Sequence, residues 1–277
     1  MVFEQITIVG VGLIGGSVGL AAKARQAAGF VVGTGREAKK LEHARALGAI
    51  DFGTTDLAVA VQGSDLIVVC TPVDRIAETI LDAAPHCKPG AIFTDGGSTK
   101  ANIANALRSL PNHVRFVPAH PLAGSEKNGV EHARADLFDK RLTILTPLKN
   151  DDAAERVASF WNALGSRVHL MLPDEHDRAL AATSHLPHAV SAAVAAATPV
   201  EWLPLSAGGF RDVTRIAGGD PALWTAIFLA NRDAVLSSLS TFTSRLDDFR
   251  RLVDTGDGAG LHRWLAEAKQ VRDALGT

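Results

Sequence analysis

The 277-residue sequence lacks the features that mark several large classes of protein. It holds only two cysteines, Cys70 and Cys87, in no metal-type spacing, so a reduced, cytoplasmic setting is the simplest interpretation. No apolar run is long enough to span a bilayer, and the N-terminus lacks the basic segment and apolar stretch of a signal peptide. The net charge of −2 argues against a nucleic-acid partner, which needs a basic surface. We therefore expect neither a membrane nor a nucleic-acid partner.

The length suits two domains, and the pattern of the chain changes after Leu172. Before that residue, short apolar runs alternate with helix-like segments, which is typical of a parallel sheet covered by helices on both faces. The expected strands are 6–10, 31–34, 66–70, 91–94, 115–118, 142–146 and 167–171, and the expected helices include 38–47, 74–84, 99–110 and 151–164. The sequence thus predicts an α/β domain over residues 1–172, built on a doubly wound parallel sheet.

Residues 173–277 show no convincing strand, and we expect them to form an all-helical domain. Asp174 is predicted to cap its first helix, and Asp220 is predicted to cap another that begins at Pro221. Apolar residues after Pro221 recur at spacings of three and four. Because these helices are rich in alanine, we expect them to pack closely against one another. We also expect their apolar surface to be buried against a second copy of the chain, in a homodimer.

The segment Gly10-Val11-Gly12-Leu13-Ile14-Gly15 follows an apolar strand and opens a helix, the context in which G-x-G-x-x-G binds a dinucleotide. Gly10 permits the tight turn, Gly12 lets the backbone approach the pyrophosphate, and Gly15 allows close packing of helix on strand. Leu13 and Ile14 lie in the first helical turn, where the helix N-terminus favours phosphate charge. A glycine-rich turn without a ligand is the less favoured alternative.

The second strand of such a domain usually ends in an acidic residue that binds the adenine ribose. Here that position is Gly35, between Thr34 and Arg36, so no carboxylate repels a 2′-phosphate and two neighbours can bind it. We therefore expect NADP to be preferred over NAD. If Arg36 is only a solvated residue at the start of a helix, the alternative is that both cofactors are used. Thr71 and Pro72, which follow the strand expected at 66–70, are also predicted to contact the cofactor.

Polar clusters interrupt the apolar pattern at residues 95–100, 120–126, 184–188 and 208–215. Ser98, in the first of them, follows a strand and precedes a helix, so it is a ligand contact, a helix cap or both. His120 directly follows the strand expected at 115–118, where a histidine is well placed for acid–base chemistry. Standing alone, it would be interpreted as a loop histidine with no role.

The other two clusters belong to the helical part of the chain. His185 and His188 are three residues apart and so share one helix face, and Pro187 between them should distort the helix. No carboxylate or cysteine stands nearby at ligand spacing, so we predict no metal site and interpret both as histidines at the edge of a core. Arg211 and Arg215 suit carboxylate recognition, unless their segment is only a solvated charged loop.

Together these motifs resemble those of the prephenate and arogenate dehydrogenases of tyrosine biosynthesis. The resemblance covers nearly the whole chain and rests on GVGLIGGS, DGGSTK, AHPLAGSEKNG, SHLPH, GGFRDVTRIA and DPALW, in the order and spacing of that family. It implies a Rossmann domain followed by a helical dimerisation domain. It also implies oxidative decarboxylation of a cyclohexadienol acid with hydride transfer to NAD(P).

The resemblance implies roles for individual residues as well. His120 matches the catalytic histidine that accepts a hydrogen bond from the ring hydroxyl, which makes the ring carbon a better hydride donor. Ser98 matches the residue that aligns this histidine with substrate and nicotinamide, and Arg215 matches the arginine that holds a substrate carboxylate. The other substrate-binding positions implied by the family are Ser125, Glu126, His188, Gly208, Asp212 and Trp224. The resemblance leaves open whether Gly208 and Trp224 reach the substrate of their own subunit or that of a partner subunit.

Prephenate is the favoured substrate, because arogenate-specific relatives often carry an apolar residue where this sequence has His188. The loop suited to NADP is shared with some arogenate enzymes, so an arogenate dehydrogenase that makes tyrosine directly is the alternative. The 3-hydroxyacid dehydrogenases share the domain plan but rely on a lysine in a G-x-x-x-N-x-x-K setting, which this sequence lacks. A non-catalytic protein that senses NADP would not need His120, Ser98 and Arg215 together.

Overall fold

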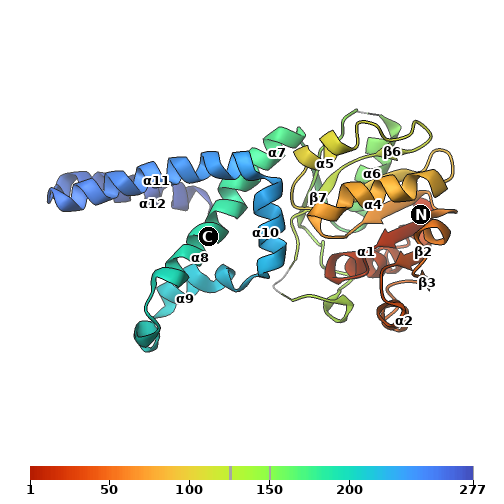
Figure 1. Cartoon of the computed structure of the whole chain (residues 1–277), viewed down its shortest axis with the longest axis horizontal. Helices are drawn as coiled ribbons and strands as arrows, with labels where there is room; N and C mark the ends of the chain where they lie inside the picture. The colour runs from red at the N-terminus through yellow and green to blue at the C-terminus, as the bar shows by residue number, and fades with distance from the viewer. Residues whose placement is uncertain (125–126, 150, 277) are drawn as a thin grey trace. The chain divides into compact units, whose positions relative to one another are not determined.

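The computed structural model describes residues 1–124, 127–149 and 151–276, and it contains two compact units, residues 1–231 and 232–277 (Figure 1). Residues 173–231 therefore belong to the same unit as the sheet. The boundary between domains 1–172 and 173–277 stays a prediction. In the part of the chain that the structure describes, no helix is both long and apolar enough to cross a membrane.

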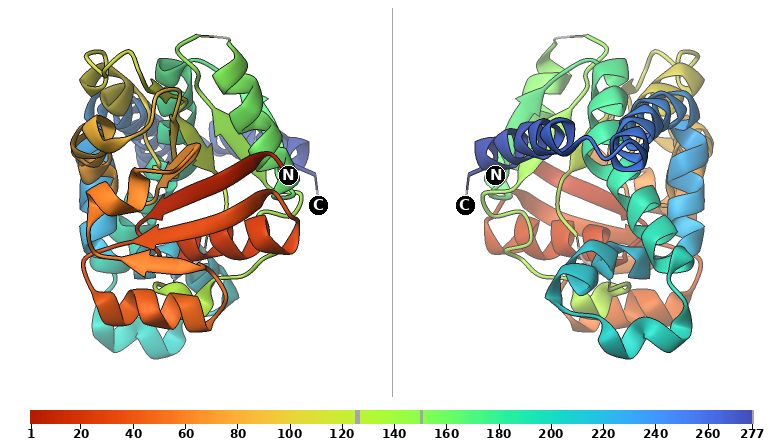
Figure 2. Two further views of the ribbon diagram at one scale, coloured as in Figure 1. Left: turned by 90° about the vertical axis from the view of Figure 1, so that its right-hand side faces the viewer. Right: turned by 90° about the vertical axis from the view of Figure 1, so that its left-hand side faces the viewer.

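Six parallel strands form the main sheet, in the order β3-β2-β1-β4-β5-β6. They are β1 (Phe3–Val9), β2 (Ala28–Thr34), β3 (Phe52–Thr54), β4 (Leu66–Val69), β5 (Ile92–Asp95) and β6 (Arg115–Phe116). The left view of Figure 2 shows β1, β2 and β3 side by side, in red to orange. The strand order reverses between β1 and β4, where doubly wound sheets bind their ligands. The predicted fold class is confirmed, although β3 is too short to show as an apolar run.

Apolar side chains from helices cover both faces of this sheet. The helices are α1 (Leu13–Ala24), α2 (Ala38–Ala46), α3 (Leu57–Val61), α4 (Ile76–Ala83), α5 (Ala101–Ala106) and α6 (Asp152–Ala163). One core cluster contains Val18 of α1 with Phe160 and Trp161 of α6. A second cluster contains Ile80 of α4 with Ile103 of α5. Two separate cores of this kind require helices on both sides of the strands, as the alternating pattern predicts.

A second, three-stranded sheet carries the residues that follow β6. It consists of β7 (Ala119–Pro121), β8 (Leu142–Leu145) and β9 (Arg167–Leu170), with β7 antiparallel to β8 and β8 parallel to β9. The strand expected at 115–118 is confirmed only for its first half, because β6 ends at Phe116 and β7 begins at Ala119. The Val117 amide still donates to the Phe93 carbonyl of β5, but the Ala119 amide donates to the Asp95 side chain instead of a β5 carbonyl. Pro118 has no amide hydrogen to donate to Thr146, so the pairing with β8 begins at Ala119. As a result His120 lies within a strand, opposite Ile144.

The helices of residues 173–231 follow the sheet. They are α7 (Pro173–Leu180), a π-helical turn η4 (Ala181–His185), α8 (Leu186–Ala197), a 3₁₀ helix η5 (Val200–Leu205), α9 (Gly208–Thr214), a 3₁₀ turn η6 (Arg215–Gly218) and α10 (Pro221–Ala230). The predicted distortion at Pro187 is confirmed, because the π-helical turn ends just before it. Asp220 caps α10 as predicted, accepting hydrogen bonds from the amides of Ala222 and Leu223 at 2.8 and 3.3 Å.

The cap expected at Asp174 was wrong. Pro173 already occupies the first helical position, where its fixed backbone angle suits a helix start, so Leu172 is the cap residue and Asp174 lies in the first turn. The acidic side chain there still faces the positive end of the helix dipole.

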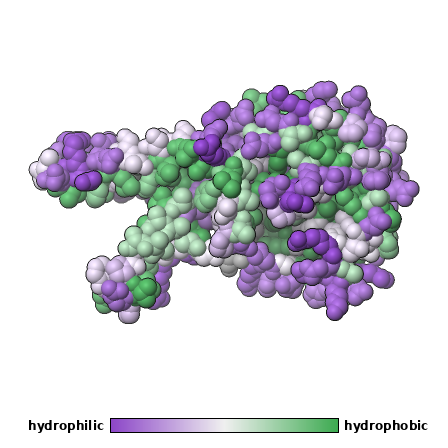
Figure 3. Space-filling view, viewed as in Figure 1, coloured by the Kyte–Doolittle hydropathy of each residue, from purple (hydrophilic) through white to green (hydrophobic). Residues whose placement is uncertain are grey.

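The second unit consists of the helices α11 (Arg232–Asp254) and α12 (Gly258–Ala274), joined by a short turn. Phe249 packs against Trp264 with ring centroids 5.2 Å apart, and Arg245 pairs with Glu267 at 2.8 Å. Large apolar side chains nevertheless stay exposed on it: Leu236, Leu239, Leu246, Phe249, Val253, Leu265, Val271 and Leu275. Figure 3 shows apolar residues, in green, along α11. The prediction of an all-helical C-terminal part is confirmed for the described residues after Leu170.

Candidate active site

Two buried charged side chains hold the residue that precedes His120. The Asp95 carboxylate accepts a hydrogen bond from the Ala119 amide at 2.9 Å, and the Lys100 ammonium donates to the Ala119 carbonyl at 2.7 Å. Lys100 and Asp95 also form an ion pair with each other, and both are fully buried. Burial lowers the pKa of Lys100, an effect that the negative charge of Asp95 opposes. Separating the two side chains would leave an uncompensated buried charge, so the pair stays together. Its hydrogen bonds to Ala119 therefore fix the backbone next to His120.

The His120 side chain begins a chain of three buried polar groups. Its Nδ1 atom lies 2.9 Å from Nε2 of His176, and Nδ1 of His176 lies 2.7 Å from Oδ1 of Asp177. The exposed fractions are 9% for His120, 0% for His176 and 4% for Asp177. His176 and Asp177 both lie on α7, so this helix places two groups behind the histidine of β7.

Asp177 also caps α5 from a distance of 77 residues in sequence. Its carboxylate accepts hydrogen bonds from the amides of Lys100 and Ala101 at 2.8 and 2.9 Å. These are two of the amides that the start of a helix leaves without an internal acceptor. The helix-cap alternative for Ser98 was therefore wrong: Ser98 lies half-buried in the loop between β5 and α5, which begins at Ala101.

A second cluster of rings gathers around Trp224 of α10. His188 stacks on its indole with ring centroids 3.4 Å apart and 26° between the planes, and His185 meets the same indole edge-on at 6.2 Å. The prediction that both histidines share one helix face is confirmed. Asn231 Nδ2 lies 3.1 Å from Nδ1 of His185 and donates to the Asp177 carbonyl at 2.7 Å. Asn231 therefore links the two clusters.

Arg215 lies close enough to His188 to influence its charge. Burial lowers the pKa of His188, and the positive charge of Arg215 lowers it further. Arg215 itself is exposed at the start of η6, which packs with α9 against α8. On α9, Gly208, Arg211 and Asp212 are also exposed. Ser125 and Glu126 lie outside the described residues.

The glycine loop has a geometry that suits a dinucleotide. Gly10 has a φ of +92°, and a Cβ atom there would lie 2.8 Å from the Cys70 carbonyl oxygen. A Cβ on Gly15 would lie 2.2 Å from the Gly10 carbonyl oxygen, so helix α1 packs directly on the loop. A Cβ on Gly12, by contrast, would meet nothing within 4 Å. The backbone at Gly12 is therefore open to a phosphate at the start of α1, whose first amides include those of Leu13 and Ile14.

The surroundings of this loop also fit a bound dinucleotide. The Thr71 hydroxyl is buried and has no hydrogen-bond partner among the described residues, as expected for a group that awaits a ligand. Pro72 is exposed beside it. Thr34 is buried, and its carbonyl accepts a hydrogen bond from the Gly10 amide at 2.9 Å, whereas Arg36 is exposed just beyond the half-buried Gly35.

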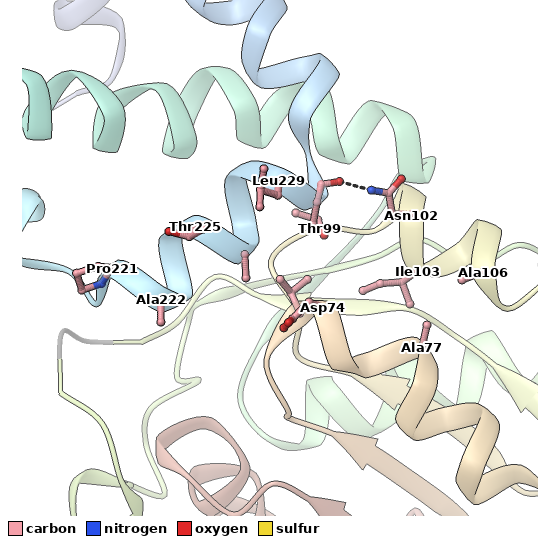
Figure 4. A pocket seen from close by; sticks show the side chains of 13 residues that line it. Asp74, Ala77, Thr99, Asn102, Ile103, Ala106, Pro221, Ala222, Thr225 and Leu229 are labelled. Carbon is pink, nitrogen blue, oxygen red and sulfur yellow. Dashed lines mark hydrogen bonds between the residues drawn. The ribbon is translucent and has the colours of Figure 1, made fainter.

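A cavity of about 710 Å³ lies beside these clusters, between α4, α5 and α10 (Figure 4). Most of its wall is apolar, and Asn102 of α5 donates to the Ala230 carbonyl of α10 at its side. None of the predicted site residues that the structure describes lines it, and among the described residues of its wall only Asp74 is titratable. It therefore offers little to an acid–base reaction.

Sequence reasoning missed several buried residues that support His120: Asp95, Lys100, His176, Asp177 and Asn231. Asp95 and Lys100 stand at the two ends of the first polar cluster, which is a local signal. The adjacent His176 and Asp177 near a helix start are a weaker one. Nothing in the sequence indicates that they meet His120.

Stability should fall in mild acid because two buried histidines are neutral in the native state. Burial lowers the pKa of His185 from 6.5 to about 4, and burial next to His176 and Lys100 lowers that of His120 well below 6.5. Between the folded and unfolded pKa values the unfolded chain binds more protons, so this stability is present above pH 6.5 and is lost as pH falls. We expect His185 alone to contribute about 2 kcal/mol less to the stability at pH 5 than at pH 7, and His120 to change the stability in the same direction.

Urea unfolding at pH 7 and pH 5 measures this loss directly. His185→Gln, which removes one titrating group, should show a smaller difference between the two pH values than the unaltered chain. Equal differences in both proteins would contradict the assignment of His185 as a neutral buried group.

Comparisons with known proteins agree with this geometry. Residues 18–170 match the model of the prephenate dehydrogenase nucleotide-binding domain, and residues 172–267 match that of the prephenate dehydrogenase dimerization domain. The chain is 37% identical to a cyclohexadienyl dehydrogenase of Zymomonas mobilis, across all of this chain and 97% of the relative.

Solved structures show the same likeness. The crystal structure of prephenate dehydrogenase from A. aeolicus, in complex with hydroxyphenyl propionate and NAD+, superposes with a TM-score of 0.90 at 32% identity, over 98% of both chains. That of Synechocystis arogenate dehydrogenase superposes with a TM-score of 0.82, also at 32% identity, over 98% of this chain and all of the other. The chain therefore belongs to the prephenate dehydrogenase family of NAD(P)-dependent oxidoreductases.

Proposed function

We propose that this chain oxidises and decarboxylates prephenate to 4-hydroxyphenylpyruvate, with hydride transfer to NAD(P), in tyrosine biosynthesis. The observation that carries the proposal is His120: a buried histidine, supported by two further buried groups, whose pKa lies well below 6.5. Such an imidazole is neutral at physiological pH and can accept a proton from a ring hydroxyl. The likeness to a prephenate dehydrogenase in complex with hydroxyphenyl propionate supports a ring-bearing acid as substrate.

The chemistry assigns His120 two proton transfers. As hydride leaves C4 of the ring, His120 accepts the hydroxyl proton, which leaves a carbonyl at C4. Loss of CO₂ from C1 then makes the ring aromatic and places negative charge on the C4 oxygen, to which His120 returns the proton. The overall reaction releases no net proton, so His120 regains its neutral form in every cycle.

The other predicted residues bind and orient the substrate. Ser98, in the loop after β5, aligns His120 with substrate and nicotinamide. Arg215 holds a substrate carboxylate, for which its planar guanidinium is suited, and His188 with Trp224 provides an aromatic wall beside it. The predicted pocket is completed by Ser125, Glu126, Gly208 and Asp212. In the proposed homodimer, Gly208 and Trp224 can belong to the pocket of their own subunit or to that of the partner subunit.

The nicotinamide dinucleotide supplies the hydride acceptor when it is bound. The residues proposed to hold its phosphates are Gly10, Gly12, Leu13, Ile14 and Gly15, and Thr71 and Pro72 are proposed to contact the dinucleotide as well. We infer that NADP is preferred over NAD, because the position directly after β2 is Gly35 rather than a carboxylate, and Arg36 is exposed next to it. Thr34 contributes chiefly through its backbone, since its side chain is buried.

The cofactor preference is tested by adding the missing carboxylate. Gly35→Asp should raise kcat/KM for NAD relative to NADP by a factor of about 10 or more, because the carboxylate repels a 2′-phosphate and binds ribose hydroxyls. A Cβ on Gly35 meets only Leu41 Cδ2, at 3.8 Å, so the change fits without strain. Gly35→Ala is the matched control and should leave the ratio unchanged. Higher kcat/KM for NAD in the unaltered enzyme would contradict the preference.

The substrate is tested with purified protein, prephenate or arogenate, and either cofactor. Growth of absorbance from the reduced cofactor should be greatest with prephenate and NADP. Greater kcat/KM with arogenate would make the chain an arogenate dehydrogenase. Absence of turnover with every combination would leave the non-catalytic NADP sensor as the surviving alternative.

We infer further that the chain forms a homodimer through its C-terminal helices. The two-helix unit 232–277 exposes eight large apolar side chains, more than a helical hairpin in water normally leaves uncovered. The match of residues 172–267 to a dimerization domain supports the same conclusion. Light scattering should report twice the mass of the chain. A cytoplasmic location stays a prediction from the sequence.

A further inference from the structure

We infer that His176 and Asp177 act as a positioning relay, which holds the His120 imidazole in the tautomer with its proton on Nδ1 and its lone pair on Nε2. The three groups are joined by contacts of 2.9 and 2.7 Å and are almost completely buried. Neither His176 nor Asp177 belongs to the predicted site. The effect of the relay on turnover rests on the function proposed above, whereas the tautomer does not.

The direction of each hydrogen bond starts from Asp177. Its Oδ1 accepts from the Lys100 amide and its Oδ2 from the Ala101 amide, so both oxygens face donors as a carboxylate requires. Oδ1 therefore has no proton to offer His176, and Nδ1 of His176 must be the donor in the contact at 2.7 Å.

The remaining bonds follow from the chemistry of imidazole. A neutral imidazole with its proton on Nδ1 has a lone pair on Nε2, so His176 accepts through Nε2. Nδ1 of His120 must then donate across the 2.9 Å contact, which places the lone pair of His120 on Nε2. That atom can accept a hydroxyl proton, whereas the opposite tautomer would offer an N–H to the hydroxyl.

The relay is anchored at several points. Asp177 caps α5, and its own carbonyl accepts a hydrogen bond from Asn231 at 2.7 Å. His120 is held from the other side, because the Asp95–Lys100 pair binds both the amide and the carbonyl of Ala119. A change of tautomer in either imidazole would break a hydrogen bond of a buried group. The buried network therefore favours one tautomer of each ring.

A doubly protonated His176 would reverse the assignment. Its Nε2 would then donate to His120, and His120 would carry its proton on Nε2. Long-range ¹H–¹⁵N correlation spectra of the full-length protein, labelled with ¹⁵N-histidine, separate the two states because protonated and unprotonated ring nitrogens differ widely in chemical shift. The His120 signals are identified by their loss in His120→Asn.

At pH 7, without substrate, we expect Nδ1 of His120 to be protonated and Nε2 to be unprotonated. A proton on Nε2 with none on Nδ1 would overturn the relay. This measurement needs no turnover, so it decides the proposal even if the substrate assignment fails.

Kinetics of a matched pair of variants provide the second readout. His176→Leu removes the acceptor for His120 and should lower kcat by a factor of about 10², with KM for substrate and cofactor within about threefold. His176→Gln places an amide oxygen near the former Nε2 position and should recover at least about tenfold of that loss. Equal kcat in the two variants would overturn the role in positioning.

Leu180→Ala controls for loosening of the same helix. Leu180 is buried on α7 but has no polar side-chain atom that could bond in the relay, so this variant should lower the melting temperature and leave kcat within about threefold. If His176→Leu does not fold, the tautomer of the unaltered protein still decides the proposal.

Discussion

His120→Asn should lower kcat by a factor of about 10² to 10⁴, the range that general acid–base groups contribute. The affinity for the dinucleotide should change little, because the glycine loop that holds the phosphates lies on β1 and α1 rather than on β7. Asparagine still accepts hydrogen bonds but cannot take up a proton at neutral pH. Steady-state rates with prephenate and NADP, together with cofactor titration by fluorescence, measure both quantities.

His169→Asn is the matched control for this variant. His169 lies exposed on β9, and its side chain forms no hydrogen bond or ion pair with another described residue, so the same exchange there should leave kcat within about twofold. If His120→Asn also stays within about twofold, then His120 is not the base and the function proposed on it loses its main support.

Arg215→Ala should raise the KM for substrate by a factor of about 10 to 100, with a smaller change in kcat. The loss corresponds to the 1.5–3 kcal/mol, roughly, that a hydrogen bond to a charged group contributes. Because the carboxylate is present in both the ground state and the approach to the transition state, the effect should fall mainly on KM. Initial rates over a range of prephenate concentrations, at saturating NADP, give the two constants separately.

Arg211→Ala provides the comparison for Arg215. Arg211 lies four residues earlier, on α9, and is exposed in the same way, yet the family resemblance assigns it no carboxylate. Its replacement should leave the KM for substrate within about twofold. An unchanged KM in Arg215→Ala with a raised KM in Arg211→Ala would move carboxylate binding to Arg211.

The main errors in the sequence-based fold arose at prolines. Next to Pro118 the chain leaves the first sheet for the second, so His120 lies within a strand of the second sheet instead of following a strand of the first. Pro173 set the start of α7, which left Asp174 inside the helix. At Pro221, by contrast, the neighbouring Asp220 formed the predicted cap. Proline marks a boundary reliably, but which neighbour becomes the cap depends on the backbone around it.

The sequence alone determined the nucleotide loop, the doubly wound sheet and the shared face of His185 and His188. Each of these depends on residues only a few positions apart, through glycine backbone angles, hydrophobic periodicity or helical spacing. Only the tertiary structure brought His120 to His176, 56 residues away, and Asp177 to Lys100, 77 residues away. Such contacts form where strands and helices that are distant in the sequence pack together, so no local sequence pattern predicts them. Once these groups are buried, each of them needs its hydrogen-bond partner.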